Sequence, residues 1–216
     1  MESKRTQAER SAATRAALLD AARPLFAERG YAAVGTDELA RAAGVTRGAL
    51  YHQFDGKLGL FAAVFEEVEA ELVERVDVAF AELFASDPLA AVRAGVDGWL
   101  AAALDPAVQR IVLLDAPAAL GWERWREIGR RYAVGLVEGA VAALIEVGVY
   151  PPQPVRPLAH LLVGALEEGT LYAASAADPA SATAEVRAAL HALLEGLSSV
   201  PLLPAHLEAD GRRGGV

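Results

Sequence analysis

Apolar residues recur along this chain with the period of a helix rather than that of a strand. Ala22 lies four positions after Leu18, and Leu25 and Phe26 follow Ala22 by three and four positions, so all four share one helical face. No stretch alternates apolar and polar residues with the two-residue period of a half-buried strand. The pattern therefore predicts an all-α protein.

Capping residues, glycines and prolines mark where the predicted helices begin and end. Thr36 and Thr46 are expected to be N-caps, because a threonine hydroxyl can accept a hydrogen bond from an amide of the first turn. Gly30 is expected to end the first helix, and residues 115–117 ("DAP") to break the chain. About nine helices result, expected at residues 6–29 or 14–29, 36–44, 46–54, 57–85, 86–104, 105–114, 122–148, 157–176 and 178–197.

Composition narrows the classes of protein and site. The 216 residues include no cysteine, which excludes a disulfide scaffold, a thiolate metal site and a cysteine nucleophile. The polar start "MESKRTQAER" does not have the pattern of a secretory signal, and no apolar run reaches membrane-spanning length. We therefore expect a cytoplasmic protein with no membrane partner.

Charge is distributed unevenly along the chain. The protein has a net charge of −9, yet residues 1–57 hold nine Lys or Arg against seven Asp or Glu, a net charge of +2. The remaining residues hold 11 basic and 22 acidic side chains, a net charge of −11. Because local potential steers binding more than net charge does, an anionic partner of the N-terminal part is compatible with this sequence.

Two predicted short helices are joined by "GVT" (residues 44–46), the spacing of a helix-turn-helix motif. In that motif the second helix enters the major groove of DNA with its N-terminal residues at the base edges. Such a helix needs a narrow apolar stripe towards its scaffold, which Val45, Leu50 and Phe54 can provide. The motif predicts that the helix at residues 46–54 reads double-stranded DNA.

The remaining residues of this helix suit contact with a duplex. Arg47 can donate two hydrogen bonds to a guanine edge, while small Gly48 and Ala49 let the backbone approach the groove. Phosphate or further base contacts are expected from Thr46, Tyr51, His52 and Gln53. Thr36 and Lys57 are expected at phosphates, because each begins a helix whose first amides also favour an anion.

The run from residue 25 to residue 66, LFAERGYAAVGTDELARAAGVTRGALYHQFDGKLGLFAAVFE, closely resembles the DNA-binding domain of the TetR, or tetracycline-repressor-like, family. The positions that carry the resemblance fall at matching spacings without gaps. They are Phe26, Gly30, Tyr31, Thr36, Leu39, Ala40, Ala43, Gly44, Val45, Gly48, Leu50, Tyr51, His52, Phe54, Lys57 and Phe61. The rest of the chain agrees with the family in its helical layout.

The resemblance implies a fold, a division into domains and a set of partners. It implies an all-α homodimer, with a three-helix helix-turn-helix DNA-binding domain at residues 1–56 and a helical ligand-binding and dimerisation domain at residues 57–200. Residues 201–216 are expected to form a disordered tail. Family members bind a palindromic operator and release it when a small molecule moves the two DNA-binding heads apart. Most are repressors, and a minority activate transcription.

Two apolar stripes near the C-terminus are candidates for the dimer interface. One lies within residues 157–176 and the other within residues 178–197, so two copies could form a four-helix interface. The proposed interface residues are Leu161, Ala165, Gly169, Tyr172, Val186, Leu190, Leu193 and Leu197. The stripes alone fit an intramolecular core equally well, and the family resemblance favours the dimer.

Ligand-binding residues are harder to assign from the sequence. Aromatic side chains between helices would suit a small apolar or aromatic effector, and a cavity is expected between the helices at residues 57–85 and 157–176. The candidates are Trp99, Arg110, Trp122, Trp125, His160 and Glu167. The alternative is that the tryptophans pack in the core and the charges face solvent.

Three functional classes fit the sequence to different degrees. A ligand-responsive DNA-binding regulator, most simply a repressor, accounts for the helix at residues 46–54 and the family resemblance. A helical ligand-binding protein without operator binding is the alternative, and the intact Arg47, Tyr51, His52 and Lys57 argue against it. An enzyme is not expected, because the chain has no glycine-rich phosphate loop, no nucleophile elbow and no metal-ligand pair at helical spacing. No cofactor is expected either.

Overall fold

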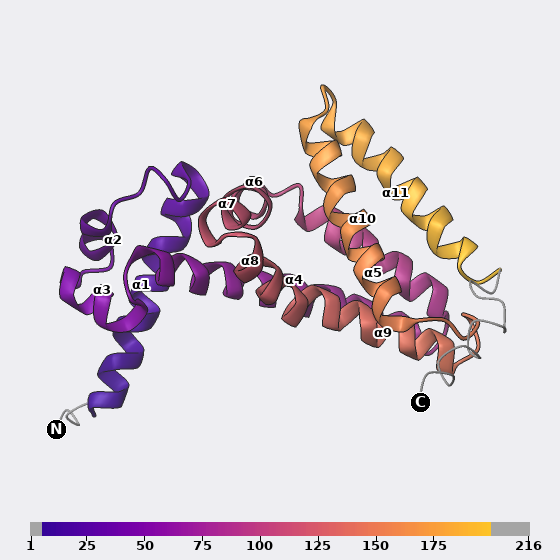
Figure 1. Ribbon diagram of the computed structural model, residues 1–216, viewed down its shortest axis with the longest axis horizontal. Coiled ribbons are helices and arrows are strands. Elements are labelled where there is room, and N and C mark those ends of the chain that lie inside the picture. Colours follow the sequence, from indigo (N-terminus) through magenta and orange to yellow (C-terminus); the bar gives the residue numbers. More distant parts are fainter. Residues whose placement is uncertain (1–5, 200–216) are drawn as a thin grey trace, which may run out of the picture. The chain divides into compact units, whose positions relative to one another are not determined.

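The computed structural model describes residues 6–199, and every regular element in this range is a helix (Figure 1). The α-helices, with two π-helical segments η1 and η2, are α1 (Gln7–Arg29), α2 (Thr36–Ala42), α3 (Arg47–Phe54), α4 (Lys57–Phe84), α5 (Pro88–Ala102), α6 (Pro106–Val108), η1 (Gln109–Asp115), α7 (Ala116–Leu120), α8 (Trp122–Gly129), η2 (Arg130–Val134), α9 (Gly135–Glu146), α10 (Val155–Ser175) and α11 (Pro179–Gly196). Because α6, η1 and α7 are continuous, as are α8, η2 and α9, the described part holds nine helical segments. The all-α prediction is confirmed. The predicted tail, residues 201–216, lies outside the described residues.

Several helix ends have the capping groups expected of their sequence. The Thr6 hydroxyl accepts from the Glu9 amide at 3.2 Å, and the Glu9 carboxylate accepts from the Thr6 amide at 2.6 Å, which together form a capping box. Gly30 ends α1 with φ of +79°, and its amide donates to the Phe26 carbonyl. Thr46 caps α3 by accepting from the Ala49 amide at 3.2 Å.

Two expected boundaries are wrong. Gly35, with the extended backbone of an N-cap, precedes α2, so Thr36 is the first helical residue rather than the cap. The chain does not break at residues 115–117, because Asp115 and Ala116 keep helical dihedrals and Pro117 lies in the first turn of α7, where proline is tolerated. The break comes instead at Gly121, which has φ of +79°.

The described residues form two compact units. Unit 1 holds residues 6–74 and Ala101–Tyr132, and unit 2 holds Arg75–Leu100 and residues 133–199. The predicted boundary at residue 56 divides the chain by function, and it stays a prediction. None of the described helices is both long and apolar enough to cross a membrane.

Aromatic packing stabilises unit 1. Phe26 of α1 and Phe61 of α4 meet edge to face with ring centroids 5.1 Å apart, and the Tyr31 ring lies 4.9 Å from Phe61. Leu39 of α2 and Leu50 of α3 are fully buried, so both helices of the motif contribute to the core. Burial of these side chains fixes which face of α3 points outward.

Unit 2 is built on the antiparallel pair α10 and α11, which lie side by side (Figure 1). Their approach is close at Gly169, where an added Cβ would lie 2.7 Å from Val186 Cγ1. Val134 packs with Ala159 and Val163 of α10 in a buried cluster.

Candidate nucleic-acid interface

The turn between α2 and α3 is held by backbone hydrogen bonds. Gly44 takes φ of +67°, a left-handed conformation that favours glycine. The Gly44 amide donates to the Arg41 carbonyl, and the Val45 amide donates to the Ala40 carbonyl at 2.9 Å. These bonds end α2 and redirect the chain into α3 over three residues, as the sequence predicts for a helix-turn-helix.

The outward face of α3 is polar and accessible. Leu50 and Phe54 are buried beneath it, whereas the residues on the other side are open to solvent. The exposed residues are Thr46, Arg47, Gly48, Tyr51 and His52, with Ala49 and Gln53 partly buried beside them. Seven of the predicted DNA-contacting residues therefore lie on or at the start of one short helix.

Arg47 is held loosely at the start of this face. Its Nη1 lies 3.4 Å from Asp37 Oδ1, in a pair whose side chains are 58% and 70% exposed. A hydrogen bond with Tyr51, and then the charge of Asp37, raises the pKa of Arg47 above its ordinary value. Because an exposed pair of this kind contributes little stability, Arg47 can exchange Asp37 for another anion or acceptor at small cost.

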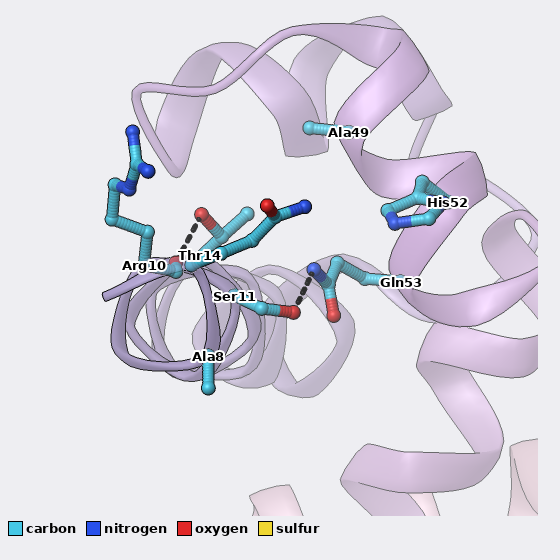
Figure 2. Close-up of a pocket in the computed structure, with 8 residues that line it drawn as sticks. Ala8, Arg10, Ser11, Thr14, Ala49, His52 and Gln53 are labelled. Carbon is cyan, nitrogen blue, oxygen red and sulfur yellow. Dashed lines mark hydrogen bonds between the residues drawn. The ribbon is translucent and has the colours of Figure 1, made fainter.

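A groove of about 550 Å³ runs between α1 and α3 (Figure 2). Figure 2 shows side chains of α1 facing those of α3 across it, and the lining residues are Gln7, Ala8, Arg10, Ser11, Thr14, Ala49, His52 and Gln53. Gln53 Nε2 donates to Ser11 Oγ at 2.8 Å, which joins the two helices. The lining contains one arginine and no carboxylate, so the groove suits an anionic or hydrogen-bond-accepting partner.

The sequence does not predict that α1 contributes to this groove. Ser11 and Gln53 are 42 residues apart, and no spacing rule links them. The positive charge of Arg10 is the one signal that could have pointed to the first helix.

The remaining two predicted DNA-contacting residues lie off α3. Thr36 is partly buried at the start of α2. Lys57, at the start of α4, donates from Nζ to the carbonyl oxygens of Tyr31 and Val34 at 2.9 and 3.0 Å. Two of the three ammonium protons of Lys57 are therefore used within the protein.

The predicted ligand-binding residues fall in both units. In unit 2, Trp99 is buried and its Nε1 donates to Thr170 Oγ1 at 3.3 Å, while His160 and Glu167 are partly buried on α10. In unit 1, Arg110 lies next to Gly30, and Trp122 and Trp125 form a ring pair with centroids 5.2 Å apart. Trp122 is 62% exposed. Neither unit gathers the whole set, and the ligand assignment stays a prediction.

The predicted dimer residues divide between the inside and the outside of the α10 and α11 pair. Leu190 is buried, and Gly169 and Val186 meet between the two helices. Leu161, Tyr172 and Leu193 are exposed by 71%, 57% and 46%. The partly buried members are Ala165 and Leu197. Three large apolar side chains thus lie on the outer surface of unit 2.

A resident metal has no site in the part of the chain described, since no group of three or more His, Asp or Glu side chains there could hold one.

Comparison with known proteins identifies the family. Residues 18–64 match the model of bacterial regulatory proteins of the tetR family, and residues 89–197 match that of the tetracyclin repressor-like C-terminal domain. The chain belongs to the TetR family.

Individual relatives agree with this assignment. A crystal structure of a TetR-family transcriptional regulator from Pectobacterium atrosepticum is 39% identical, covers 91% of this chain and all of that one, and superposes with a TM-score of 0.77. The Transposon Tn10 TetC protein of Escherichia coli is 29% identical over 168 residues, which are 76% of this chain and 82% of that protein. The HTH-type transcriptional repressor BepR of Brucella suis is 38% identical over 102 residues, 39% of this chain and 48% of that protein.

The family resemblance noted from residues 25–66 is therefore confirmed. This TetR-family protein is a helix-turn-helix transcriptional regulator, and the family consists of regulators rather than enzymes.

Proposed function

We propose that this TetR-family protein is a repressor that binds a palindromic operator as a homodimer and is released by a small apolar or aromatic effector. The observation that carries the proposal is the outward face of α3. Five accessible residues on it offer hydrogen-bond donors, acceptors and small side chains, above a buried stripe that prevents the helix from rotating. A helix of this kind suits the major groove of a duplex.

Arg47 is assigned to base reading. It is exposed, carries a charge at any physiological pH and is restrained by Asp37 at 3.4 Å. Bidentate donation to a guanine edge would replace that weak pair with two well-aligned hydrogen bonds. Tyr51 and His52 lie further along the same exposed face and are assigned to phosphates or neighbouring bases.

The groove beside α3 is assigned to the DNA backbone. Ser11 Oγ accepts from Gln53 Nε2, which leaves the Ser11 proton and the second amide proton of Gln53 available to an acceptor. Arg10 adds a positive charge to the same lining. Phosphodiester oxygens match this set of donors, and they would extend the contact from α3 to the first turns of α1.

A second copy is expected on the outer face of α10 and α11. Leu161, Tyr172 and Leu193 expose large apolar surfaces that water solvates poorly. Burying them in a two-fold interface would place two α3 helices on one duplex. Heads about 34–36 Å apart would read successive major-groove faces, and the operator would be a palindrome.

The repressor and effector parts of the proposal have separate support. BepR, a repressor, is similar over part of the chain. In unit 2, the indole of Trp99 is buried with its Nε1 bonded to Thr170 Oγ1, which places an aromatic ring in the interior where an apolar effector could contact it. An effector that moves the operator-bound fraction from about 99% to 1% would need about 5.5 kcal/mol of differential affinity.

Selection of bound duplexes from a random pool tests the DNA-binding core of the proposal. We expect a palindromic consensus. Arg47→Ala should weaken binding to that consensus by about 1–3 kcal/mol, roughly 5- to 150-fold, and relax specificity at one position of each half-site. The matched control is Arg156→Ala, which removes a 72%-exposed arginine of unit 2 and should leave affinity unchanged. A wild-type protein that binds no duplex at low salt would overturn the proposal.

The effector is tested by thermal shift against a library of small apolar and aromatic compounds. Compounds that raise the melting temperature should also release the consensus duplex. If stabilising compounds tighten operator binding instead, the protein is a co-repressor-dependent regulator or an activator, and the repressor assignment fails.

A further inference from the structure

The loop between α1 and α2, residues 30–35, is held from two sides by elements distant in sequence. Asp115, the last residue of η1, contacts it on one side, and Lys57, the first residue of α4, contacts it on the other. We propose that Asp115 and Lys57 are positioning residues for DNA binding, which set the orientation of α2 and α3 without touching DNA. The inference rests on the proposed function above.

The contact from η1 is short and charge-assisted. Asp115 Oδ2 accepts a hydrogen bond from the Tyr31 amide at 2.7 Å, across 84 residues of sequence. The preceding Gly30 has φ of +79°, and an added Cβ there would lie 2.9 Å from Arg110 Nη1 and 3.2 Å from Asp115 Oδ2. Glycine at position 30 therefore allows both the positive φ and the close approach of the loop to η1.

The contact from α4 engages the same loop through its carbonyl groups. Lys57 Nζ donates to the carbonyl oxygens of Tyr31 and Val34, and it lies 4.1 Å from the centroid of the Tyr31 ring. The Tyr31 ring in turn packs on Phe61. Tyr31 is thus held through its amide, its carbonyl and its ring, by residues from two different segments.

Loop 30–35 leads directly into α2, whose N-cap is Gly35. Because α2 packs on α3, a displacement of the loop displaces the DNA-reading face. Asp115 also ends a π-helical segment, and such segments are frequent at functional sites. A displacement of η1 would withdraw the carboxylate from the Tyr31 amide, so residues 106–120 can influence operator affinity through this contact.

This role for Lys57 differs from the phosphate contact expected from the sequence, and salt dependence separates the two. Each lost phosphate contact reduces the slope of log Kd against log salt by about 0.9. Lys57→Met retains the alkyl stem but removes the ammonium. We expect it to weaken binding to the selected consensus duplex about tenfold at every salt concentration, with an unchanged slope. The comparison is Arg10→Met, which removes a cation lining the groove and should lower the slope.

Asp115 is tested with a conservative pair. Asp115→Ala removes the acceptor and should weaken consensus binding about tenfold. Asp115→Asn keeps an oxygen acceptor and should restore affinity to within about threefold of wild type. Because a homodimer would lose two phosphate contacts, the proposal is overturned if the slope falls by about 1.8 in Lys57→Met. It is also overturned if Asp115→Ala binds as wild type does, or if Asp115→Asn is as weak as Asp115→Ala.

Hydrogen exchange of the full-length protein gives a readout that does not need DNA. The Tyr31 amide should exchange slowly in wild type and in Asp115→Asn, and at least tenfold faster in Asp115→Ala, while core amides of α10 keep their protection. If Asp115→Ala fails to fold, Tyr31 exchange in Asp115→Asn decides, and fast exchange there overturns the proposal. A wild-type protein that binds no duplex but protects Tyr31 would overturn the proposed function and leave the loop contact standing.

Discussion

The two units expose different kinds of side chain: polar residues on α3 of unit 1, and large apolar residues on α10 and α11 of unit 2. In unit 1, α3 buries Leu50 and Phe54 and exposes polar residues such as Arg47 and His52. In unit 2, α10 and α11 bury part of their apolar residues against each other and still expose Leu161, Tyr172 and Leu193. The exposed hydrogen-bond donors of α3, with the weakly paired Arg47, suit DNA, which is a hydrated polyanion. The exposed apolar side chains of unit 2 suit contact with another apolar surface. The contrast matches the partners proposed for the two units, DNA for unit 1 and a second copy of the chain for unit 2.

The largest expected effect comes from making the apolar surface of unit 2 charged. Leu161→Glu with Leu193→Glu would bury unpaired carboxylates in the proposed interface, at a cost of about 3–5 kcal/mol each. We expect the dimer dissociation constant to rise by at least about 100-fold and operator binding to be lost with it. Sedimentation equilibrium measures the first effect, and fluorescence anisotropy on the consensus duplex measures the second.

The control for this pair is Ala184→Glu. Ala184 is an exposed residue of α11 nine positions before Leu193, which places it on the opposite helical face. The Ala184→Glu variant should therefore remain dimeric. Wild-type protein that sediments as a monomer at micromolar concentration would remove the basis of the comparison.

The two units also differ in whether there is space for an added Cβ at a helical glycine. A Cβ at Gly59, where α4 starts beside the end of α3, would lie 1.5 Å from the Phe54 carbonyl oxygen. Gly59→Ala must displace backbone and is expected to cost about 3 kcal/mol, the upper end for overpacking. Gly139, exposed within α9, has no atom within 4 Å of an added Cβ. Gly139→Ala should stabilise by about 0.5–1 kcal/mol. Urea denaturation measures both, and equal effects would contradict the assigned close approach.

In unit 2, the buried hydroxyl of Tyr150 makes a hydrogen bond whose contribution to stability should depend on pH above neutrality. The Tyr150 hydroxyl donates to the Leu194 carbonyl at 3.1 Å, near the end of α11, where that carbonyl lies in the last turn of the helix. Tyr150→Phe should cost about 1–3 kcal/mol at neutral pH, because the acceptor is left buried.

Burial raises the pKa of Tyr150 from 10.0 to about 12, which gives this bond a pH dependence. The unfolded chain loses the phenol proton first, so the stabilisation is complete below pH 10 and is lost as pH rises towards 12. At pH 11 the difference between wild type and Tyr150→Phe should have shrunk by about 1 kcal/mol. Denaturation curves at pH 9 and pH 11 measure this change, and a constant difference would show that Tyr150 titrates normally.

The smallest expected effect is the difference in coupling energy between two ion pairs, one in each unit. Arg23 of α1 makes a two-pronged pair with Glu71 of α4 at 2.5 and 2.7 Å, and the pair is about 40% exposed. In unit 2, Arg156 lies 3.8 Å from Glu138. A double-mutant cycle should give at most about 1 kcal/mol for the first pair and nothing measurable for the second. A larger coupling energy for Arg156 and Glu138 than for Arg23 and Glu71 would contradict this prediction.

Much of the fold and part of the site could be predicted because they depend on neighbours in sequence. Periodicity and caps such as Thr46 located the helices, since a helix is formed by contacts three or four residues apart. The break expected at residues 115–117 was wrong, because proline breaks a helix only where its missing amide and its ring conflict with a preceding turn.

By itself, the sequence determined an all-helical chain, a helix-turn-helix and the polar composition of α3. Tertiary structure alone decided that Ser11 meets Gln53, that Asp115 meets the Tyr31 amide, and that Leu190 is buried while Leu193 is exposed. The physical reason is that helical periodicity assigns a residue to a face but does not say what covers that face. That depends on contacts between segments tens of residues apart, which form only when the chain packs.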